Sequence, residues 1–474
     1  MALFKKITVE IPLFFCFVNF LLTSSVLTNL IVYRTCYILL EFNRTRCAEL
    51  GNHVNQDTEH LEKLVEPTAD IIIMIKSLVE SLFPIFVCMF AGPWSDKHGR
   101  KPILLMTLIG MTCGSILMIV FSFFEYLSPW YVLFTSVPSM LTGSSTTYFA
   151  VTLSYLSDIS TDETRAMRMV SYEVALACGV LIGSVSSSYI FYASNYQTIF
   201  GIGSCCMIIS CLYVFFFIPE SLESKKLNSQ DSTTEVESRR VRLVYIADVI
   251  RTAFKKRENY ERALIILSIA SIIIITFATG GDYSIQFIFL RGKLNWNLRK
   301  YTLFSSAYHA CWVIGTMCGT FILQKKLKIR EFVLALVGLS SLLSCVILQL
   351  FATSDIFIYI GGVTKCLGGM VAPMLRSQVS RLVSVDEAGK IFSITVAGGA
   401  LISLGASPLY TAIYNATINI DAALFNILTI VLIGAAIVLV LIAIILENIS
   451  NSSTQQNETH TIIENETDSE NSTQ

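Results

Sequence analysis

The sequence predicts an all-α membrane protein in which twelve transmembrane helices form two halves of six. The composition is the first reason: 53% of the 474 residues are hydrophobic and 15% are charged, whereas a soluble protein carries about 25% charged residues. The second is a series of apolar runs that reach the roughly 20 residues needed to cross a bilayer as a helix. The third is a polar, charged segment, residues 219–262, that separates six runs from six.

The spans are expected wherever such a run occurs, because a helix satisfies its own backbone hydrogen bonds in lipid. The spans of the first half are residues 9–33, 70–91, 102–124, 130–156, 168–191 and 197–218. The spans of the second half are residues 263–290, 300–323, 331–351, 356–380, 389–409 and 422–446. The chain therefore divides into a first half (1–218) with an outer loop (34–69), a central loop (219–262), a second half (263–446) and a tail (447–474).

Lys and Arg residues collect in alternate loops, which sets the orientation because cytosolic loops are enriched in them. The basic loops follow the even-numbered spans and contain Lys97, Arg100, Lys101, Arg165, Arg168, the cluster 225–262, Lys325, Lys326, Lys328, Arg330, Arg381 and Lys390. Four of the intervening loops contain no Lys or Arg, and the exceptions are the loops 34–69 and 291–300. Both termini and the central loop are therefore expected in the cytosol.

Sequons for N-glycosylation occur on both predicted sides. Asn43 and Asn415 fall on the outer side, where glycosylation takes place. Five more lie in the predicted cytosolic tail, at Asn448, Asn451, Asn457, Asn465 and Asn471. Either these are chance products of an Asn/Ser/Thr-rich composition, or the number of spans has the other parity. The tail carries acidic charge and few apolar residues, so we expect it to be disordered.

The cysteines give no sign of a metal or redox site. Eleven of the 13 lie inside apolar runs, where cysteine behaves as a small hydrophobic residue, and Cys36 and Cys47 lie in or beside the outer loop. No CxxC pair, nucleotide-binding loop or nucleophile–base arrangement occurs. We therefore expect no metal, no cofactor and no enzymatic activity. The net charge of −1, spread over short loops, predicts no nucleic-acid partner.

The strongest local motif lies between the second and third spans. Residues 92–101, GPWSDKHGRK, fit the loop pattern G-x-x-x-D-[RK]-x-G-R-[RK] of major facilitator transporters at every specified position. Gly92 allows a close helix approach and Gly99 a tight turn. Asp96 can face a helix N-terminus, and Arg100 can donate to an acidic partner, for which we nominate Asp158 at the end of the fourth span. These five residues form a candidate conformational latch.

Charged residues within the predicted spans are candidate functional residues, since a charge at the bilayer centre costs at least ~2.5 kcal/mol. They are Lys76, Glu80, Glu173, Asp282, His309, Lys365 and Arg376. Lys76 and Glu80 are four residues apart on one helical face and form either a structural pair or part of a ligand site.

The tenth span combines two cations with residues that loosen a helix. Lys365 and Arg376 are eleven residues apart, about three turns, so both are expected on nearly the same face. Gly368, Gly369 and Pro373 lie in the same stretch and let a solute approach the backbone. Two cations on one face predict an anion path, with Asp282 as a further substrate contact; alternatively, Arg376 extends to the cytosolic interface.

Glu173 and His309 are the candidate proton-coupling residues. Glu173 lies among apolar neighbours, where lost hydration favours the neutral carboxyl group, so it can bind and release a proton. A structural, hydrogen-bonded glutamate is the alternative. His309 can also titrate near neutral pH, although a single histidine on an apolar helix also serves in packing.

At these positions the chain resembles solute carrier family 46, the group that contains the proton-coupled folate transporter. The similarity covers nearly the whole chain and is carried by the loop motif, Ser157-Asp158, Arg168-Met169, Glu173, Asp282, Ser306-Ala307, His309, Ala372-Pro373, Arg376, Leu382-Val383 and Phe392-Ser393; Pro219-Glu220-Ser221 matches a tripeptide of many facilitators. The resemblance implies that Glu173 acts in proton coupling and that Arg376 acts in proton and substrate binding. It also implies that Asp96 and Arg100 are needed for carrier cycling.

The chain departs from this family at several positions. A family arginine and aspartate of the fourth span appear as Ser136 and Ser144, and a family histidine of the seventh span aligns with Phe277. The family's outer disulfide joins the first loop to the loop between spans 7 and 8, but residues 291–300 contain no cysteine. A local bridge between Cys36 and Cys47 is the outer pairing that remains.

The sequence therefore predicts a secondary transporter of a small organic anion, folate-like or related, that works by alternating access with proton symport. The expected partners are the solute, protons and the lipid bilayer. A facilitator of a sugar or other neutral solute is one alternative, and a transport-inactive receptor on the same fold is another. The outer sequons favour the plasma membrane, while Glu458-Thr-His-Thr-Ile462-Ile463 resembles an acidic dileucine signal for a lysosomal location.

Overall fold

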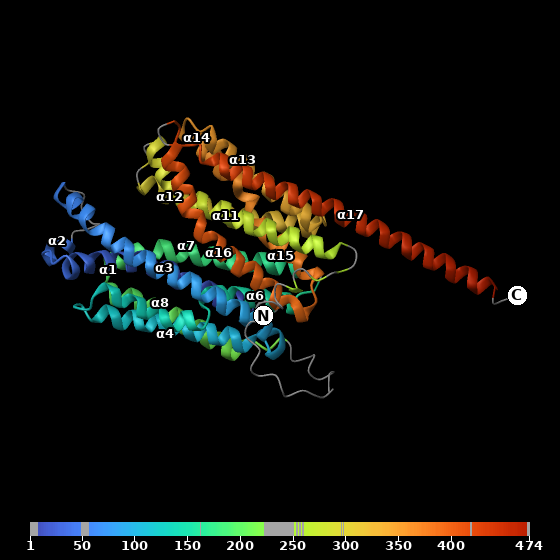
Figure 1. Cartoon of the computed structure of the whole chain (residues 1–474), viewed down its shortest axis with the longest axis horizontal. Helices are drawn as coiled ribbons and strands as arrows, with labels where there is room; N and C mark the ends of the chain where they lie inside the picture. The colour runs from blue at the N-terminus through green and yellow to red at the C-terminus, as the bar shows by residue number, and fades with distance from the viewer. Residues whose placement is uncertain are drawn as a thin grey trace.

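A computed structural model shows a bundle of long helices that run roughly parallel or antiparallel to one another (Figure 1). It describes residues 8–48, 56–161, 163–221, 251–252, 255, 257, 260–294, 296, 298–417 and 420–471. All regular elements within these ranges are helical. We call the end of the bundle with Asp96 and Arg100 the inner end, and the end with Cys36 and Cys47 the outer end.

The helices follow the predicted spans with modest changes of length. The first half contains α1 (Glu10–Arg34) with a π-helical turn η1 (Thr35–Leu39), α2 (Arg44–Ala48), α3 (Gln56–His98), α4 (Lys101–Phe123), the short η2 (Pro129–Tyr131), α5 (Val132–Leu141), α6 (Ser144–Ile159), α7 (Arg165–Ala193) and α8 (Tyr196–Phe217). The second half contains α11 (Glu261–Leu294), α12 (Leu298–Gly319) with η3 (Thr320–Lys326), α13 (Glu331–Leu350), α14 (Asp355–Thr364), η4 (Lys365–Met370), α15 (Val371–Leu382), α16 (Val385–Thr417) and α17 (Asn426–Asn471).

Eleven of the described helical segments are long and apolar enough to cross a membrane. The remaining predicted span, residues 130–156, consists of two shorter helices, α5 and α6, which meet at Thr142 and Gly143. Gly143 has φ of +87°, a conformation that side chains disfavour, and Pro138 lies within α5. The twelve predicted spans are thus recovered, but the fourth is a broken helix rather than a continuous one.

The segments outside the predicted spans also contain helical residues. The outer loop 34–69 contains helix α2, and α3 already begins at Gln56. The tail, expected to be disordered, continues α17 as helix to Asn471 and projects beyond the bundle (Figure 1). A helix pairs its backbone groups within itself, so it needs no hydrophobic core to satisfy them. Most of the central loop, 222–250, lies outside the described residues.

The two halves pack together at the inner end. There, one buried cluster joins residues of α1, α4, α6 and α7 to residues of α11, α15 and α16, and another joins Ala166 and Val170 of α7 to the second half. At the outer end, one cluster contains residues of the first half alone, and a separate cluster contains residues of the second half alone. The bundle is therefore closed at its inner end.

Candidate functional site

An ion pair between α7 and α15 joins the two halves of the bundle. Arg376 of α15 contacts Glu173 of α7 through its Nη1 and the carboxylate Oε1. Both side chains are largely buried, and the guanidinium carbon of Arg376 lies 5.7 Å from the ring centre of Tyr172. The Nε of Arg376 is buried without a hydrogen-bond partner among the described residues. The two residues that the sequence nominated for proton and anion chemistry are thus in direct contact.

A second buried pair lies within the second half. Lys365 Nζ is 3.5 Å from Asp282 Oδ2 of α11 and 5.1 Å from the ring centre of Tyr308 in α12. Asp282 Oδ1 is buried and has no hydrogen-bond partner in the described part of the chain. Lys365 opens the 3₁₀ segment η4, where Gly369 packs so closely that a Cβ would collide with Thr316 and Trp312.

Lys365 and Arg376 do not share a set of partners, although their spacing predicted a common helical face. The six residues of η4 follow a 3₁₀ path, which turns about 120° per residue instead of about 100°. Over the six residues of η4, the direction in which side chains point is rotated by roughly 120° relative to a continuous α-helix. Lys365 therefore contacts helices of the second half, while Arg376 contacts α7 of the first.

The other charged residues of the spans are also engaged. His309 Nδ1 lies 2.6 Å from the carbonyl oxygen of Ser305, one turn earlier in α12, so one ring nitrogen is committed to the backbone. Lys76 and Glu80 pair at 2.5 Å on α3, as one of the two interpretations of the sequence expected. Ser136 of α5 donates to the same Glu80 oxygen at 2.5 Å.

The candidate latch is assembled at the inner end around Arg100. This side chain is fully buried; its Nη1 is 2.5 Å from Asp96 Oδ1 and its Nε donates to Asp158 Oδ2 at 2.9 Å. Burial lowers the pKa of Arg100, but the two carboxylates outweigh it and raise the pKa above its ordinary value. Asp158 is therefore placed as the sequence expected.

Two glycines bring the latch against the second half. The amide of Gly389 in α16 donates to Asp96 Oδ1 at 2.9 Å. A Cβ on Gly389 would lie 2.5 Å from that oxygen, and a Cβ on Gly92 would lie 2.5 Å from the Gly389 carbonyl oxygen. Neither glycine leaves room for a side chain in this arrangement, so α3 and α16 meet backbone to backbone. Ser157 and Ser380 make a further hydroxyl contact between the halves.

Glu220 completes the latch, and the sequence marked it only as part of a common tripeptide. Its carboxylate accepts from the backbone amides of Arg100 at 2.8 Å and Lys101 at 3.1 Å, at the N-terminus of α4. A carboxylate is favoured there by the unpaired amides and the helix dipole. Gly99, with φ of +110°, packs so closely that a Cβ would lie 2.5 Å from Glu220 Oε2. Gly389 was not nominated at all, because it acts through its backbone amide, which no residue type marks.

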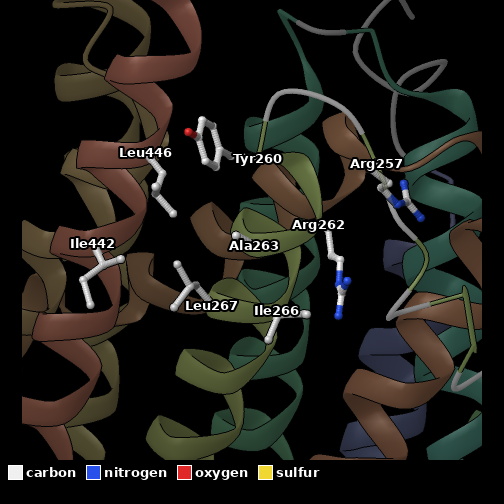
Figure 2. Close-up of a pocket in the computed structure, with 8 residues that line it drawn as sticks. All are labelled: Arg257, Tyr260, Arg262, Ala263, Ile266, Leu267, Ile442 and Leu446. Carbon is white, nitrogen blue, oxygen red and sulfur yellow. The ribbon is translucent and has the colours of Figure 1, made fainter.

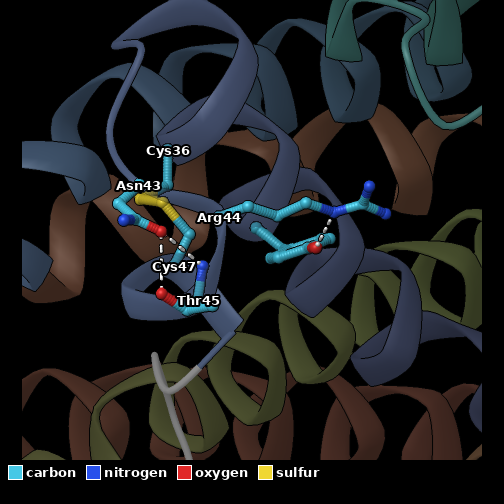
Figure 3. Close-up of a disulfide and its surroundings, with 6 residues drawn as sticks. Cys36, Asn43, Arg44, Thr45 and Cys47 are labelled. Atoms are coloured by element: carbon cyan, nitrogen blue, oxygen red, sulfur yellow. Dashed lines mark hydrogen bonds between the residues drawn. A yellow bond between two sulfur atoms is a disulfide. The ribbon is translucent and has the colours of Figure 1, made fainter.

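A small disulfide-bonded loop marks the outer end. A disulfide joins Cys36 and Cys47, whose Cα atoms are 5.8 Å apart (Figure 3). Asn43 lies within this loop, is exposed, and accepts hydrogen bonds from the amide and hydroxyl groups of Thr45 at 3.0 and 2.7 Å. The second outer sequon residue, Asn415, is exposed near the end of α16. Both side chains are accessible for glycosylation.

The arrangement of two halves around buried charges at broken helices matches a known protein family. Residues 16–408 match the family model of the Major Facilitator Superfamily. The chain belongs to this superfamily. Its members are transporters rather than enzymes, in agreement with the sequence-based expectation.

The most informative relatives are solute carrier family 46 proteins, which confirms the resemblance. A Drosophila melanogaster protein described as "Probable peptidoglycan muropeptide transporter SLC46" is 28% identical over 88% of this chain and 81% of its own length. The proton-coupled folate transporter of Rattus norvegicus is 24% identical over 86% of each chain. A lysosomal proton-coupled steroid conjugate and bile acid symporter of Gallus gallus is 23% identical over 87% of this chain and 89% of that protein.

Solved structures confirm the fold of this superfamily member. The human organic anion transporter MFSD10 superposes with a TM-score of 0.67 at 15% identity, covering 91% of this chain and 97% of that one. The transporter FucP in its outward conformation superposes with a TM-score of 0.59 at 10% identity, covering 92% and 97%. The chain is thus a multi-pass membrane protein with the two-half transporter fold.

Proposed function

We propose that this protein moves a small organic anion together with a proton by alternating access. The contact between Glu173 and Arg376 carries the proposal, because it places a titratable acid and a permanent cation together between the two halves. Arg376 stays charged at physiological pH and can hold a carboxylate in bidentate fashion. In the present arrangement Glu173 is paired with Arg376, so a solute carboxylate would compete with Glu173 for the guanidinium group.

Protonation of Glu173 resolves this competition. A neutral carboxyl group binds a guanidinium more weakly than a carboxylate does, so proton binding releases Arg376 for the anionic solute. The free Nε of Arg376 and the free Oδ1 of Asp282 are further buried groups that a polar solute can satisfy. Solute and proton then neutralise the site together, which lets the outer side close over it without burying an unpaired charge.

The latch supplies the second half of the cycle. Opening of the inner end must separate α3 from α16, which breaks the hydrogen bond between Asp96 and the Gly389 amide. The bonds from Arg100 to Asp96 and Asp158 lie within the first half and need not break. Arg100 therefore holds Asp96 in position so that the inner end can close again after release.

The names of the relatives agree with an anionic solute. Folate and bile acids carry carboxylates, and the names of two of these relatives include proton coupling. We place the protein in the plasma membrane because of the two outer sequons, with Asn43 and Asn415 glycosylated. The lysosomal location of one relative makes the lysosome the alternative. A transport-inactive receptor is disfavoured, because a static protein has no use for a latch between halves.

A facilitator of a neutral solute is the second candidate function. It is favoured by one observation, namely that both cations of the tenth span are already paired with acids. A site whose own charges already cancel can bind a sugar or another uncharged polar solute, because that solute adds no charge that would need a counter-ion.

Uptake measurements separate the two candidates. Labelled methotrexate, folate, a bile acid conjugate, a muropeptide and a hexose are offered to cells at acidic and neutral outer pH. An anion symporter shows acid-stimulated uptake of one of the anions; Glu173→Gln abolishes the stimulation but spares exchange across a loaded membrane. Arg376→Lys keeps the charge but loses the forked donor, so the half-saturating concentration rises by about tenfold. Hexose uptake without acid stimulation would establish the neutral-solute function instead.

A further inference from the structure

A groove at the inner end of the second half lies outside the transport pathway. It runs between the start of α11 and the last turns of the span in α17, and is lined by Arg257, Tyr260, Arg262, Ala263, Ile266, Leu267, Ile442 and Leu446 (Figure 2). Tyr260, Leu267, Ile442 and Leu446 lie around the gap between the two helices, whereas Arg257, Arg262 and Ile266 lie on the side of α11 turned away from α17. The side of the groove facing α17 is thus mostly apolar, and the cationic groups lie on the other side.

This groove faces the membrane at the depth where the hydrocarbon gives way to headgroups. Tyr260 and Arg262 stand at the start of the span in α11, and both are exposed. Tyrosine and arginine are the residues that anchor a helix at this depth. Ile442 is exposed on α17 within the span. A ligand in the groove therefore meets lipid on its open side rather than bulk water.

The two arginines are not neutralised to the same extent. Arg257 donates to Glu387 Oε2 at 2.8 Å and to the carbonyl oxygen of Leu382 at 3.0 Å, but its Nε is buried without a partner. Arg262 makes no ion pair within the part of the chain that the structure describes. The groove consequently has excess positive charge, and it accepts an anion more readily than a neutral or cationic group.

We propose that this groove binds an anionic phospholipid of the inner leaflet. An acyl chain lies along Leu267, Ile442 and Leu446, and the phosphate lies near the start of α11 within reach of Arg262. Basic pockets between membrane helices on the cytosolic side recognise acidic headgroups in this manner. A neutral lipid gains only the apolar contacts.

The test compares lipid binding by the full-length protein and two groove variants. Monodisperse protein in phosphatidylcholine nanodiscs is titrated with a fluorescent phosphatidylserine or phosphatidylcholine, and the bound fraction is measured. We expect the wild type to prefer phosphatidylserine. Arg262→Gln should reduce its affinity by about fivefold, since one arginine near the surface contributes about that factor. Ala263→Phe fills the apolar part, keeps both arginines, and should reduce the affinity for both lipids.

The matched control is Lys328→Gln, which removes one exposed inner-end cation that does not line the groove. It should leave phosphatidylserine binding unchanged. An equal loss in Lys328→Gln and Arg262→Gln would show general surface attraction and overturn the proposal. So would equal binding of both lipids by the wild type, or unaltered binding by Ala263→Phe. If the groove is instead covered by a second copy of the chain, Ala263→Phe converts a dimer to a monomer without any lipid preference.

Discussion

The fourth and tenth spans occupy corresponding places in the two halves, and both are broken, yet they differ in what the break contains. In the fourth span the break is Thr142–Gly143, flanked by α5 and α6, and Ser136 and Ser144 lie near it. In the tenth span the break is the 3₁₀ segment η4, which begins with Lys365, and Arg376 follows in α15. The helix break of the fourth span thus has no charged residue, whereas that of the tenth span contains Lys365 and is followed by Arg376.

This difference indicates that the break and the charge have separate roles. Broken helices expose backbone groups to a central cavity, which is tolerated in a membrane only beside protein or water. Close packing explains the geometry in both spans, since Gly143 would collide with Thr147, and Gly369 with Thr316, on gaining a Cβ. The cations of the tenth span supply the chemistry, and one of them, Arg376, contacts Glu173 of the first half.

Removing the charge from the tenth span should have the largest effect. Lys365→Met leaves Asp282 buried without its cation, and breaking a buried pair in this way costs about 3 kcal/mol of stability. The double variant Asp282→Asn with Lys365→Met removes both charges and should recover most of that loss. Thermal stability in detergent measures this comparison. Equal stability of the single and double variants would contradict a structural pairing of Lys365 with Asp282.

Altering the break of the fourth span should have the next largest effect. Gly143→Ala forces a side chain into positive φ and against Thr147, with an expected cost of about 2 kcal/mol. Gly434→Ala is the control, because Gly434 lies within α17 with open space around it. It should be neutral or slightly stabilising. If both variants unfold at the same temperature as the wild type, the break in the fourth span is not enforced by packing.

The latch of the first half gives a smaller effect. Glu220→Gln keeps an acceptor near the amides of Arg100 and Lys101 but loses the charge that favours a helix N-terminus, at a cost of about 1 kcal/mol. We expect slower transport with surface expression retained. Glu163→Gln, on an exposed inner loop, is the control. Surface biotinylation and initial uptake rates separate expression from cycling; an unchanged rate would remove Glu220 from the latch.

Changes to the sequons should leave stability unchanged and alter glycosylation alone. Asn43→Gln and Asn415→Gln should each remove a glycosidase-sensitive shift on a gel. Asn457→Gln and Asn465→Gln should have no effect, because the tail is predicted to be cytosolic. A shift in either tail variant would place the tail outside and change the parity of the spans.

The sequence predicted those parts of the fold that depend on local composition. The spans followed from apolar runs, and the pairing of Arg100 with Asp158 followed from the forked donor of the loop motif, for which Asp158 was the nominated acidic partner. Glu173 and Arg376 were nominated separately by the cost of burying charge, and their contact 203 residues apart in the chain emerged from the packing of α7 against α15.

The features that were missed depend on geometry at single residues. Gly143 could not be identified as a break, because one glycine in an apolar run is compatible with a continuous helix. The 3₁₀ path of η4 was invisible in the spacing of Lys365 and Arg376, so their common face was predicted wrongly. Gly389 acts through its backbone amide, and Glu220 through its position above the start of α4. No pattern of residue types encodes either contact.

The bridge between Cys36 and Cys47 also has a consequence for how the protein sits in the membrane. Disulfides persist in oxidising compartments, such as the cell exterior or the lumen of the secretory route, and are reduced in the cytosol. The bridge therefore indicates the orientation of the protein in the membrane independently of the lysines and arginines in the loops. It requires the α2 end to lie outside the cytosol, so Asp96, Arg100 and the start of α11 lie on the cytosolic side, where thiols stay reduced.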